Sequence, residues 1–306
     1  MIAIFRLYRS DGTYFNTGEV YKFSFIKEVY TPYSYFYVTF DADDLADGEY
    51  TGAWFNVNYH TVSRSIIDTL KIVKENGKKI GHVSGRSYTS LLLENQLPPG
   101  MYSRLSINNL VDDYFSIPNI THESNGDESY IFVKKGSSMW DGVVNLAYKL
   151  TGRYPYIRSE NTIMISDPTE PNIFTYTDDD ILSIGNELDT RRLVSGLHMA
   201  DLEGNYGVYD LTDSEAAARD IVRNRYFELD RRFLYDPLQG CQFRDAIAKR
   251  KFRRKFISYH GYNGEDLGDK ATFGDVVNGR ISAVRITGNM SGIFTEISVY
   301  EDSFNP

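Results

Sequence analysis

The first 96 residues alternate apolar and polar positions with the period of two that is typical of a half-buried antiparallel sheet. Asp11-Gly12 and Asn76-Gly77 are two-residue hairpin signals, and the second is the strongest in the chain. The pattern predicts strands at Ile2–Arg9, Glu19–Tyr30, Tyr33–Asp41, Thr69–Lys74 and Lys79–Ser84. We therefore expect this region to be a sheet built from hairpins.

One of these strands, Tyr33–Asp41, is apolar on both faces. Its tyrosines fall on one face, and its phenylalanines and valine fall on the other. A strand of that kind is covered twice, by a core on one side and by another domain or subunit on the other. We take four of its residues as candidate interface positions: Tyr33, Tyr35, Phe36 and Tyr37.

The middle of the chain carries helix signals. Tyr88–Asn95 is predicted to be a short helix with Ser87 as its N-cap, and Pro98-Pro99-Gly100 marks a domain boundary. A strand at Tyr130–Val133 is followed by a helix at about 138–151. The apolar stripe of that helix is Met139, Val143, Leu146, Ala147 and Leu150, and Gly152 is its C-cap. A strand at Thr162–Ile165 completes a small α+β unit within residues 101–170.

Residues 172–211 return to the strand pattern, with Arg192–Asp201 expected to pair with Tyr206–Leu211. Thr212 and Glu215 have the spacing of a capping box, which predicts a helix to about Tyr226. Asp236-Pro237 predicts the start of another helix that ends near Arg254. The expected closing strands are Phe256–Tyr262, Arg280–Thr287 and Phe294–Glu301.

Aromatic residues are abundant, with 24 Tyr and 18 Phe among 306 residues. This favours a β-rich body with much subunit contact, although a β-rich core alone would explain the same excess. The net charge of −9 disfavours sequence-independent nucleic-acid binding, and it suits a channel wall that nucleic acid passes without sticking. Cys241 is the only cysteine, which excludes an intramolecular disulfide. We find no signal-peptide core or membrane-length segment, so we expect folding in the cytoplasm.

Signals for catalysis and metal binding are poor. No phosphate-binding, dinucleotide-binding or nucleophile-elbow motif is present. Asp41–Gly48 lacks the Gly and Glu positions of a calcium loop, so a solvated turn is the better interpretation. Asp178–Asp180 is interpreted as a turn and cap, with an acidic patch facing a partner or a lumen as the alternative. The five histidines lie far apart in the sequence: His60, His82, His122, His198 and His260. We therefore expect no enzyme and no cofactor.

One basic run, Lys249–Lys255, stands out in this acidic chain. It ends a predicted helix, where the helix dipole favours cations. A solvated helix end is one interpretation, and a docking patch for an acidic neighbour is the other. Nucleic-acid binding ranks third, because Phe252 is the only aromatic residue in the run that could stack on bases. Its candidate interface residues are Lys249, Arg250, Lys251, Arg253 and Arg254.

The strand–turn–helix–strand unit of residues 130–165 resembles the LysM module that binds cell-wall glycans, with Gly136 at the turn and Trp140 in the first helical turn. In that module a second helix helps to form the glycan groove. The interval between the helix and the last strand is too short here for a second helix. Trp140 is therefore expected to fill the core against Tyr130 and Ile163.

The order of parts over nearly the whole chain resembles the phage tail hub family, also called the late-control D or baseplate-hub family. The motifs that carry this resemblance are Gly85-Arg86-Ser87, Lys135-Gly136, Trp140-Asp141, Leu267-Gly268-Asp269, and the terminal pair Ile281–Arg285 with Gly292–Ile297. The resemblance implies a β-dominated α+β fold with two tail-tube-like antiparallel β-barrel domains, a small LysM-like α+β domain and a helical insertion. The implied domains are 1–100 plus 172–211 for the first barrel, 101–171 for the small domain, and 212–306 for the second barrel with its helical segment 213–254.

Members of that family form trimeric rings that adapt a hexameric tail tube to a trimeric spike and leave an axial channel. The resemblance therefore implies a homotrimer in the baseplate of a virion or tailocin, assembled in the host bacterial cytoplasm. The implied partners are the tail tube, spike and tape-measure proteins and baseplate wedge or sheath components, with DNA only as unbound cargo and no membrane. A LysM-type peptidoglycan-binding protein or a cell-wall hydrolase component of the tail tip is the alternative. The sequence leaves open whether the tail contracts, whether it carries a genome, and which host it serves.

Overall fold

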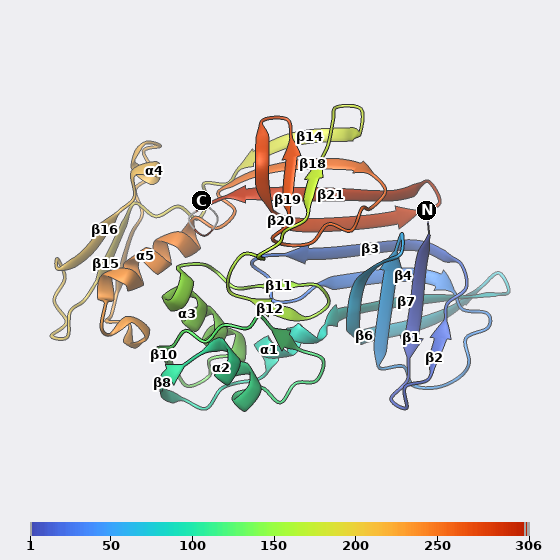
Figure 1. Ribbon diagram of the computed structural model, residues 1–306, viewed down its shortest axis with the longest axis horizontal. Coiled ribbons are helices and arrows are strands. Elements are labelled where there is room, and N and C mark those ends of the chain that lie inside the picture. Colours follow the sequence, from blue (N-terminus) through green and yellow to red (C-terminus); the bar gives the residue numbers. More distant parts are fainter. Residues whose placement is uncertain (1, 303, 305–306) are drawn as a thin grey trace.

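Strands dominate the chain, as expected for a β-dominated α+β protein (Figure 1). The structure is a computed structural model that describes residues 2–302 and 304; residues 1, 303, 305 and 306, which the expected domain boundaries include, lie outside it. The main path of its 13-stranded sheet is β14 (Ile181–Leu188), β18 (Arg253–His260), β21 (Gly292–Glu301), β20 (Val276–Asn289), β3 (Val20–Glu28), β4 (Tyr35–Asp41), β7 (Lys78–Ser87), β6 (His60–Glu75), β5 (Gly52–Val57), β1 (Ala3–Tyr8) and β2 (Tyr14–Asn16). β19 (Lys270–Phe273) branches from β20, and β13 (Ile173–Thr175) pairs with β19.

Pairing of β3 with β20 fuses the N-terminal and C-terminal halves of the chain into one sheet. The ladder runs from Ala283 opposite Glu28 to Gly288 opposite Phe23. One apolar core lies within both halves, and its buried members include Phe5, Phe36, Phe40, Phe55, Ile257, Leu267, Ile286 and Ile297. Among the described residues the path has open ends at β14 and β2, so the closure of two separate barrels remains an expectation.

Four phenylalanines of this sheet lie directly opposite glycines, in the pairs Phe23–Gly288, Phe36–Gly85, Phe40–Gly81 and Phe256–Gly185. Each ring occupies the space that a side chain would need if the glycine were replaced by a larger residue. A Cβ on Gly85 would lie 2.7 Å from the Phe36 ring and would also overlap the carbonyl oxygen of Ile66. An aromatic ring over a cross-strand glycine restores the contacts that the missing side chain gives up. These glycines therefore let the large rings fit within the sheet.

The central strands alternate between buried and open positions. Phe36 on β4 is 1% exposed and faces the core, whereas Tyr35 is 40% exposed on the opposite face. The neighbouring β3 repeats this alternation, with Phe25 buried and Ile26 exposed. We call the open side, which includes Tyr35, Ile26 and Arg285 of β20, the outer sheet face. Only one face of β4 is thus covered within the chain.

The predicted hairpins are confirmed. β1 and β2 pair across the turn that contains Asp11-Gly12. β6 and β7 pair across Asn76-Gly77, where φ is 51° and 85°, as a type I′ turn requires. The last two strands, β20 and β21, pair from Asn289 opposite Gly292. Local turn chemistry therefore sets the register of these strands.

The small α+β unit folds largely as expected below the sheet in Figure 1. β8 (Gly100–Leu105) pairs with β10 (Ser129–Val133), and β11 (Tyr156–Arg158) pairs with β12 (Thr162–Met164), which also pairs with β9 (Thr121–His122). The predicted helix is α3 (Met139–Thr151), with a Ser138–Asp141 capping box and Gly152 at φ 69°. A second helix, α2 (Ile107–Tyr114), was missed; it begins at Ser106, whose hydroxyl oxygen accepts the N–H of Asn109.

The short helix before this unit is also confirmed, as the 3₁₀ turn η1 (Tyr88–Ser90) followed by α1 (Leu91–Glu94). Ser87 is the N-cap residue as expected, but its side chain does not cap the turn. The Ser87 hydroxyl instead accepts the N–H of Ser34, at 3.0 Å, and makes no cap hydrogen bond. The Ser87 hydroxyl thus links the Ser34 backbone to the Thr89 side chain, which lies 2.9 Å away, instead of capping a backbone N–H.

A third part, which we call the lateral unit, is formed by β15 (Gly196–Met199), β16 (Tyr209–Thr212), β17 (Asn224–Phe227), α4 (Ser214–Ala217), η2 (Arg231–Phe233) and α5 (Pro237–Ala248). The hairpin of β15 with β16 is confirmed. The predicted helix from Thr212 to Tyr226 is wrong: Asp213 is the N-cap, the helix ends at Ala217, and the chain then pairs in parallel with β15 as β17. The start of α5 at Asp236-Pro237 is confirmed, but the predicted end near Arg254 is wrong, because the helix ends at Ala248 and β18 begins at Arg253.

The strand pairing also changes the expected domain division. Residues 172–211 were assigned to the first barrel with 1–100. β13 and β14 pair instead with β19 and β18 of the C-terminal half, while β15 and β16 belong to the lateral unit. Strand pairing here joins segments that are far apart in the sequence, such as β14 and β18, and local sequence signals do not indicate which distant strands will pair.

Asp230 ties the lateral unit together beside the small unit. Its fully buried carboxylate accepts hydrogen bonds from Arg232 at 2.7 Å and Arg244 at 2.5 Å, and Lys134 of the small unit lies 3.9 Å away. Burial alone would raise the pKa of Asp230, but the hydrogen bonds and charges of the two arginines hold it low, at about 2. This carboxylate is therefore a structural anchor.

Candidate functional site

The five histidines pack or form hydrogen bonds within the chain. For example, Nδ1 of His82 lies 3.0 Å from the Tyr37 hydroxyl oxygen, and Nδ1 of His198 lies 2.9 Å from a carboxylate oxygen of Asp210. Within residues 2–302 and 304, no three His, Cys, Asp or Glu residues gather as a metal site would require. No helix in that part of the chain has the length and apolar character needed to cross a membrane.

Two acidic runs form turns. Asp41 accepts the N–H of Asp43 at 3.0 Å, and Asp43 accepts the N–H of Lys79 at 2.6 Å. Asp180 accepts both the N–H and the hydroxyl of Thr177, and these two hydrogen bonds lower the pKa of Asp180. The expected solvated turns are therefore found at both places.

Trp140 lies in the core of the small unit, as expected. It is 3% exposed, its ring centroid is 6.4 Å from that of Tyr154, and Ile163 belongs to the same buried cluster. Tyr130, the other expected neighbour, packs instead against Tyr235 with ring centroids 5.0 Å apart. The indole is thus used for packing, as are Val143 and Leu146 of the helix stripe.

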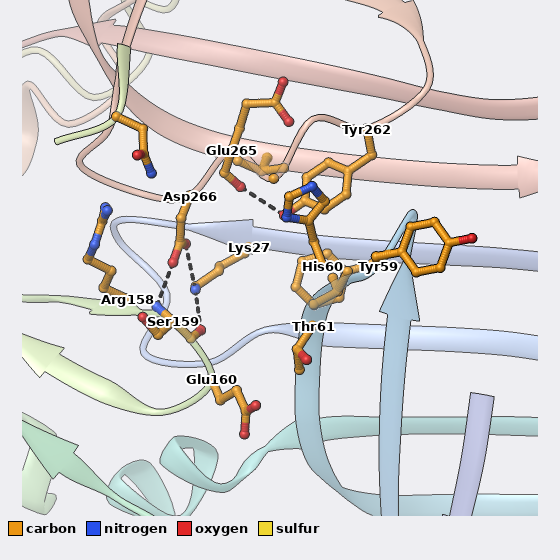
Figure 2. A pocket seen from close by; sticks show the side chains of 15 residues that line it. Lys27, Tyr59, His60, Thr61, Arg158, Ser159, Glu160, Tyr262, Glu265 and Asp266 are labelled. Atoms are coloured by element: carbon orange, nitrogen blue, oxygen red, sulfur yellow. Dashed lines mark hydrogen bonds and ion pairs between the residues drawn. The ribbon is translucent and has the colours of Figure 1, made fainter. Parts of the chain in front are cut away.

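A buried cluster of charged side chains lies where β3, the small unit and the loop before β19 meet; we call it the buried joint (Figure 2). Lys27 projects from the core side of β3 and is 5% exposed. Its Nζ donates to Asp266 Oδ1 at 2.7 Å and to the Ser159 carbonyl oxygen at 2.6 Å, and the Ser159 N–H donates to Asp266 Oδ2 at 2.5 Å. Three segments far apart in sequence are thereby tied together.

Arg158 and Asp269 form the second pair of the buried joint. Arg158 donates to Asp269 Oδ1 at 2.7 Å and to the Leu267 carbonyl oxygen at 2.5 Å. The Asp269 carboxylate is fully buried and also accepts the N–H groups of Asn172 and Asp266, each at 3.0 Å. Because each charge has a partner of opposite sign and further hydrogen bonds, the cost of burying the pair is offset.

Glu265 is the third acidic group of the buried joint and is 2% exposed. It accepts the hydroxyl hydrogens of Tyr176 and Tyr259 and the N–H of Asn263 at 3.1 Å. Burial, followed by the nearby negative charge of Glu265, raises the pKa values of both tyrosines, so they act as hydrogen-bond donors.

A cleft of about 410 Å³ opens over the buried joint, lined by Tyr59, His60 and Glu160 among others. Its two cations, Lys27 and Arg158, are already paired with buried carboxylates. The cleft therefore offers no unpaired cation to an anionic ligand, and the arrangement is best suited to fixing three parts of the chain in place.

Sequence reasoning found part of this joint. Leu267-Gly268-Asp269 was named only through the family resemblance, and Lys27 and Arg158 were missed. One available signal was the position of Lys27, which follows Phe23 and Phe25 on the core side of an alternating strand. A lysine in such a row is buried only when it is paired.

The cations of the basic run Lys249–Lys255 have partners within the chain. Its cations contact acidic or aromatic side chains of the same chain: Lys249 pairs with Asp213 and Asp245, Arg250 lies over Tyr30 and Tyr154, Lys251 pairs with Glu28, Arg253 with Glu215, Arg254 with Glu187 and Glu296, and Lys255 with Asp275 and Glu301. The run connects α5 to β18. Its charge therefore joins the lateral unit to the sheet, which weighs against the docking interpretation.

The outer sheet face extends across most of the main sheet. One row of directly opposed residues crosses eight strands, from Ile66 through Arg86, Tyr35, Ile26, Arg285, Glu296 and Ser258 to Ser183. The charges on this face are balanced, with Lys22, Arg86, Arg254 and Arg285 against Glu28, Asp41, Glu187 and Glu296. The acidity expected of a channel wall is therefore not concentrated here.

The candidate residues of β4 divide between the two faces. Tyr35 and Tyr37 lie on the outer sheet face. Tyr33 lies just before β4, and the Arg86 guanidinium lies over the Tyr33 ring, 5.7 Å from the ring centroid. Phe36 belongs to the core, so another chain cannot reach it in this fold.

No protein-family model matches the sequence, and no curated protein matches it. Solved structures do match along the whole chain. The 43 kDa tail protein of prophage MuSo2 from Shewanella oneidensis is 13% identical with a TM-score of 0.74, covering 99% of both chains. The tail protein from Neisseria meningitidis MC58 is 14% identical with a TM-score of 0.74, covering 99% of this chain and 97% of that one.

A third match is the E. coli c3393 protein, described as a component of the type VI secretion system with structural similarity to the T4 bacteriophage tail proteins gp27 and gp5. It is 8% identical with a TM-score of 0.58, covering 94% of this chain and 75% of that one. At these identities the likeness concerns the fold. The chain has the fold of phage tail proteins, and the family resemblance drawn from its sequence is confirmed at that level.

Proposed function

We propose that this chain is a structural hub of a phage tail or phage-tail-like particle, in which three copies form a ring between the hexameric tail tube and the trimeric spike. The observation that carries the proposal is the likeness to prophage tail proteins over 99% of the chain, at a TM-score of 0.74.

The architecture supports this role. Each chain brings two antiparallel halves that share one sheet. Three copies would present six such halves around an axis, which suits contact with a six-fold tube, while the ring itself keeps the three-fold symmetry of a spike. The buried joint and Asp230 would hold the small and lateral units in place against mechanical load.

The partners of such a hub would be further copies of itself, the tail tube, spike and tape-measure proteins, and baseplate wedge or sheath components. DNA would pass through as unbound cargo. The place of action would be the baseplate of a virion or tailocin after assembly in the bacterial cytoplasm. We propose no covalent chemistry, because the acidic runs are used in turns and the buried carboxylates in the joint.

Tyr35 and Phe36 provide a matched test of this role. Phe36→Asp should destabilise the monomer by about 4 kcal/mol or more, because it buries a charge without a partner. Tyr35→Asp should change the free energy of unfolding by less than about 1 kcal/mol, since Tyr35 is 40% exposed. It should nevertheless lower the yield of complete tails roughly tenfold, because a tail component would cover the outer sheet face.

Urea unfolding of the purified variants would measure stability, and complementation of a deletion strain would measure tail yield. Normal tails from the Tyr35→Asp variant would rule out a covered outer sheet face at this position.

A further inference from the structure

Two strand edges of the main sheet, one on β14 and one on part of β6, lack a partner. The strands from β14 to β6 form an antiparallel band, β14-β18-β21-β20-β3-β4-β7-β6. β14 pairs only with β18. At the other end, β5 pairs with β6 only as far as Ile66, so residues 69–75 of β6, which we call the distal arm, pair only with β7. Within the described chain, no other backbone hydrogen bond reaches the outer edge of either segment.

The two free edges have matching apolar faces and lengths. β14 has eight residues and the distal arm has seven. Ile184 lies opposite the buried Ile257, and Ile72 lies opposite Gly81, which is covered by Phe40; both therefore face the core side of the band. Ile184 is 55% and Ile72 is 42% exposed, and Leu188 adds another exposed side chain on β14. A long apolar edge of this kind promotes pairing with another chain.

The charges at the two edges are opposite in sign. Asp178–Asp180 comes just before β14. The distal arm and its turn carry four lysines, Lys71, Lys74, Lys78 and Lys79, against one acidic residue, Glu75, which lies opposite Lys78. Within the described residues none of these lysines has an ion pair. Lys74 and Lys79 lie directly opposite one another, and this like-charge pair is unfavourable in an isolated sheet. A partner with negative charge would relieve it.

Strand direction also fits a contact between the edges. The band has eight strands and every neighbouring pair in it is antiparallel, so β14 and β6 run in opposite directions. If the β14 edge of one copy meets the β6 edge of the next, the new pair is therefore antiparallel as well. The start of β14 then lies beside the end of the distal arm, which brings Asp178–Asp180 to the lysines at the hairpin turn.

We propose that β14 of one copy pairs with the distal arm of the next copy, so that each chain uses two different edges and the contacts close head to tail into a ring. This inference rests on the proposed trimeric ring and names the contact that forms it. Pairing at both edges removes the exposed apolar strands from solvent, and main-chain hydrogen bonds continue the sheet from one copy to the next.

Cross-linking between full-length single-cysteine variants tests this contact. Ile72→Cys and Ile184→Cys chains are co-expressed in assembling particles and treated with a short bis-maleimide; Cys241 can stay because it is buried. The mixture of the two variants should cross-link, and either variant alone should not, because the contact joins different edges. A chain with both cysteines should give a covalent trimer. Met290→Cys, 92% exposed on another turn, is the matched control.

Charge exchange gives a second readout. Lys74→Glu with Lys78→Glu should lower the cross-linking yield roughly tenfold, and Asp178→Lys with Asp179→Lys on the same chain should restore it. If particles contain the ring but the mixture cross-links no better than each variant alone or the Met290→Cys control, the edge contact is wrong and the lysines only protect an exposed edge. If the protein is in the particle but forms no ring, the proposed function itself fails.

Discussion

Gly85→Ala is expected to destabilise the protein by about 3 kcal/mol or more, although it adds only one methyl group. The new Cβ would lie 2.7 Å from the Phe36 ring and would overlap the Ile66 carbonyl oxygen. The ring is in the core, and the carbonyl belongs to the neighbouring strand β6, so neither can move without breaking the sheet.

Gly126→Ala is the matched control, because no atom lies within 4 Å of its added Cβ. Urea unfolding of both variants would give the change in the free energy of unfolding. Gly81→Ala should also destabilise the protein, but Phe40→Leu should partly rescue it, since the three atoms nearest to that methyl group all belong to the Phe40 ring. Equal stabilities of the Gly85→Ala and Gly126→Ala variants would contradict the role of the Phe–Gly pairs.

Asp269→Ala is expected to cost roughly 3–5 kcal/mol, because removing one partner of a buried ion pair leaves the other charge without compensation. The change would leave Arg158 with the Leu267 carbonyl oxygen as its remaining hydrogen-bond partner in the joint. It would also remove the acceptor of two partly buried N–H groups, those of Asn172 and Asp266. The segment that links the small unit to the sheet should then open more often, so limited proteolysis between residues 166 and 172 should become faster.

A double-mutant cycle that combines Asp269→Ala with Arg158→Met isolates the interaction energy between these two side chains from their other contacts. The buried joint predicts a coupling energy of about 1–3 kcal/mol between the two positions. Additive effects would mean that Arg158 and Asp269 do not depend on one another, and the joint would then be an incidental contact.

Local sequence signals predicted the elements whose physics is local. Asn76-Gly77 is a type I′ turn because both positions accept positive φ, and α3 begins at a capping box and ends at a left-handed glycine. These features depend on residues within four positions of one another. They gave the hairpins, the central helix and the start of α5 with nearly the observed bounds.

The errors arose where distant residues decide the outcome. The capping-box spacing of Thr212 and Glu215 predicted a helix to about Tyr226, yet residues 224–227 form β17 because β15 offers a strand edge. The basic run at Lys249–Lys255 was prominent in sequence, and the structure pairs its charges with acidic residues such as Glu28 and Glu301 that lie far away along the chain. The sequence did not indicate that the lysines of the distal arm lack acidic partners within the described chain, because that lack depends on the fold.

The buried joint was only partly predictable for the same reason. Its members come from β3, from the turn before β12 and from the loop before β19. A single lysine on the core side of an alternating strand indicates a buried partner, but it does not say which of the 42 acidic residues that partner is.

The most direct test of the proposed function is the position and copy number of this chain in an intact particle, determined by electron cryo-microscopy. We predict three copies in a ring on the tail axis, between the tube and the spike, with β14 of each copy beside β6 of the next. One copy, six copies, or a position off the tail axis would contradict the account.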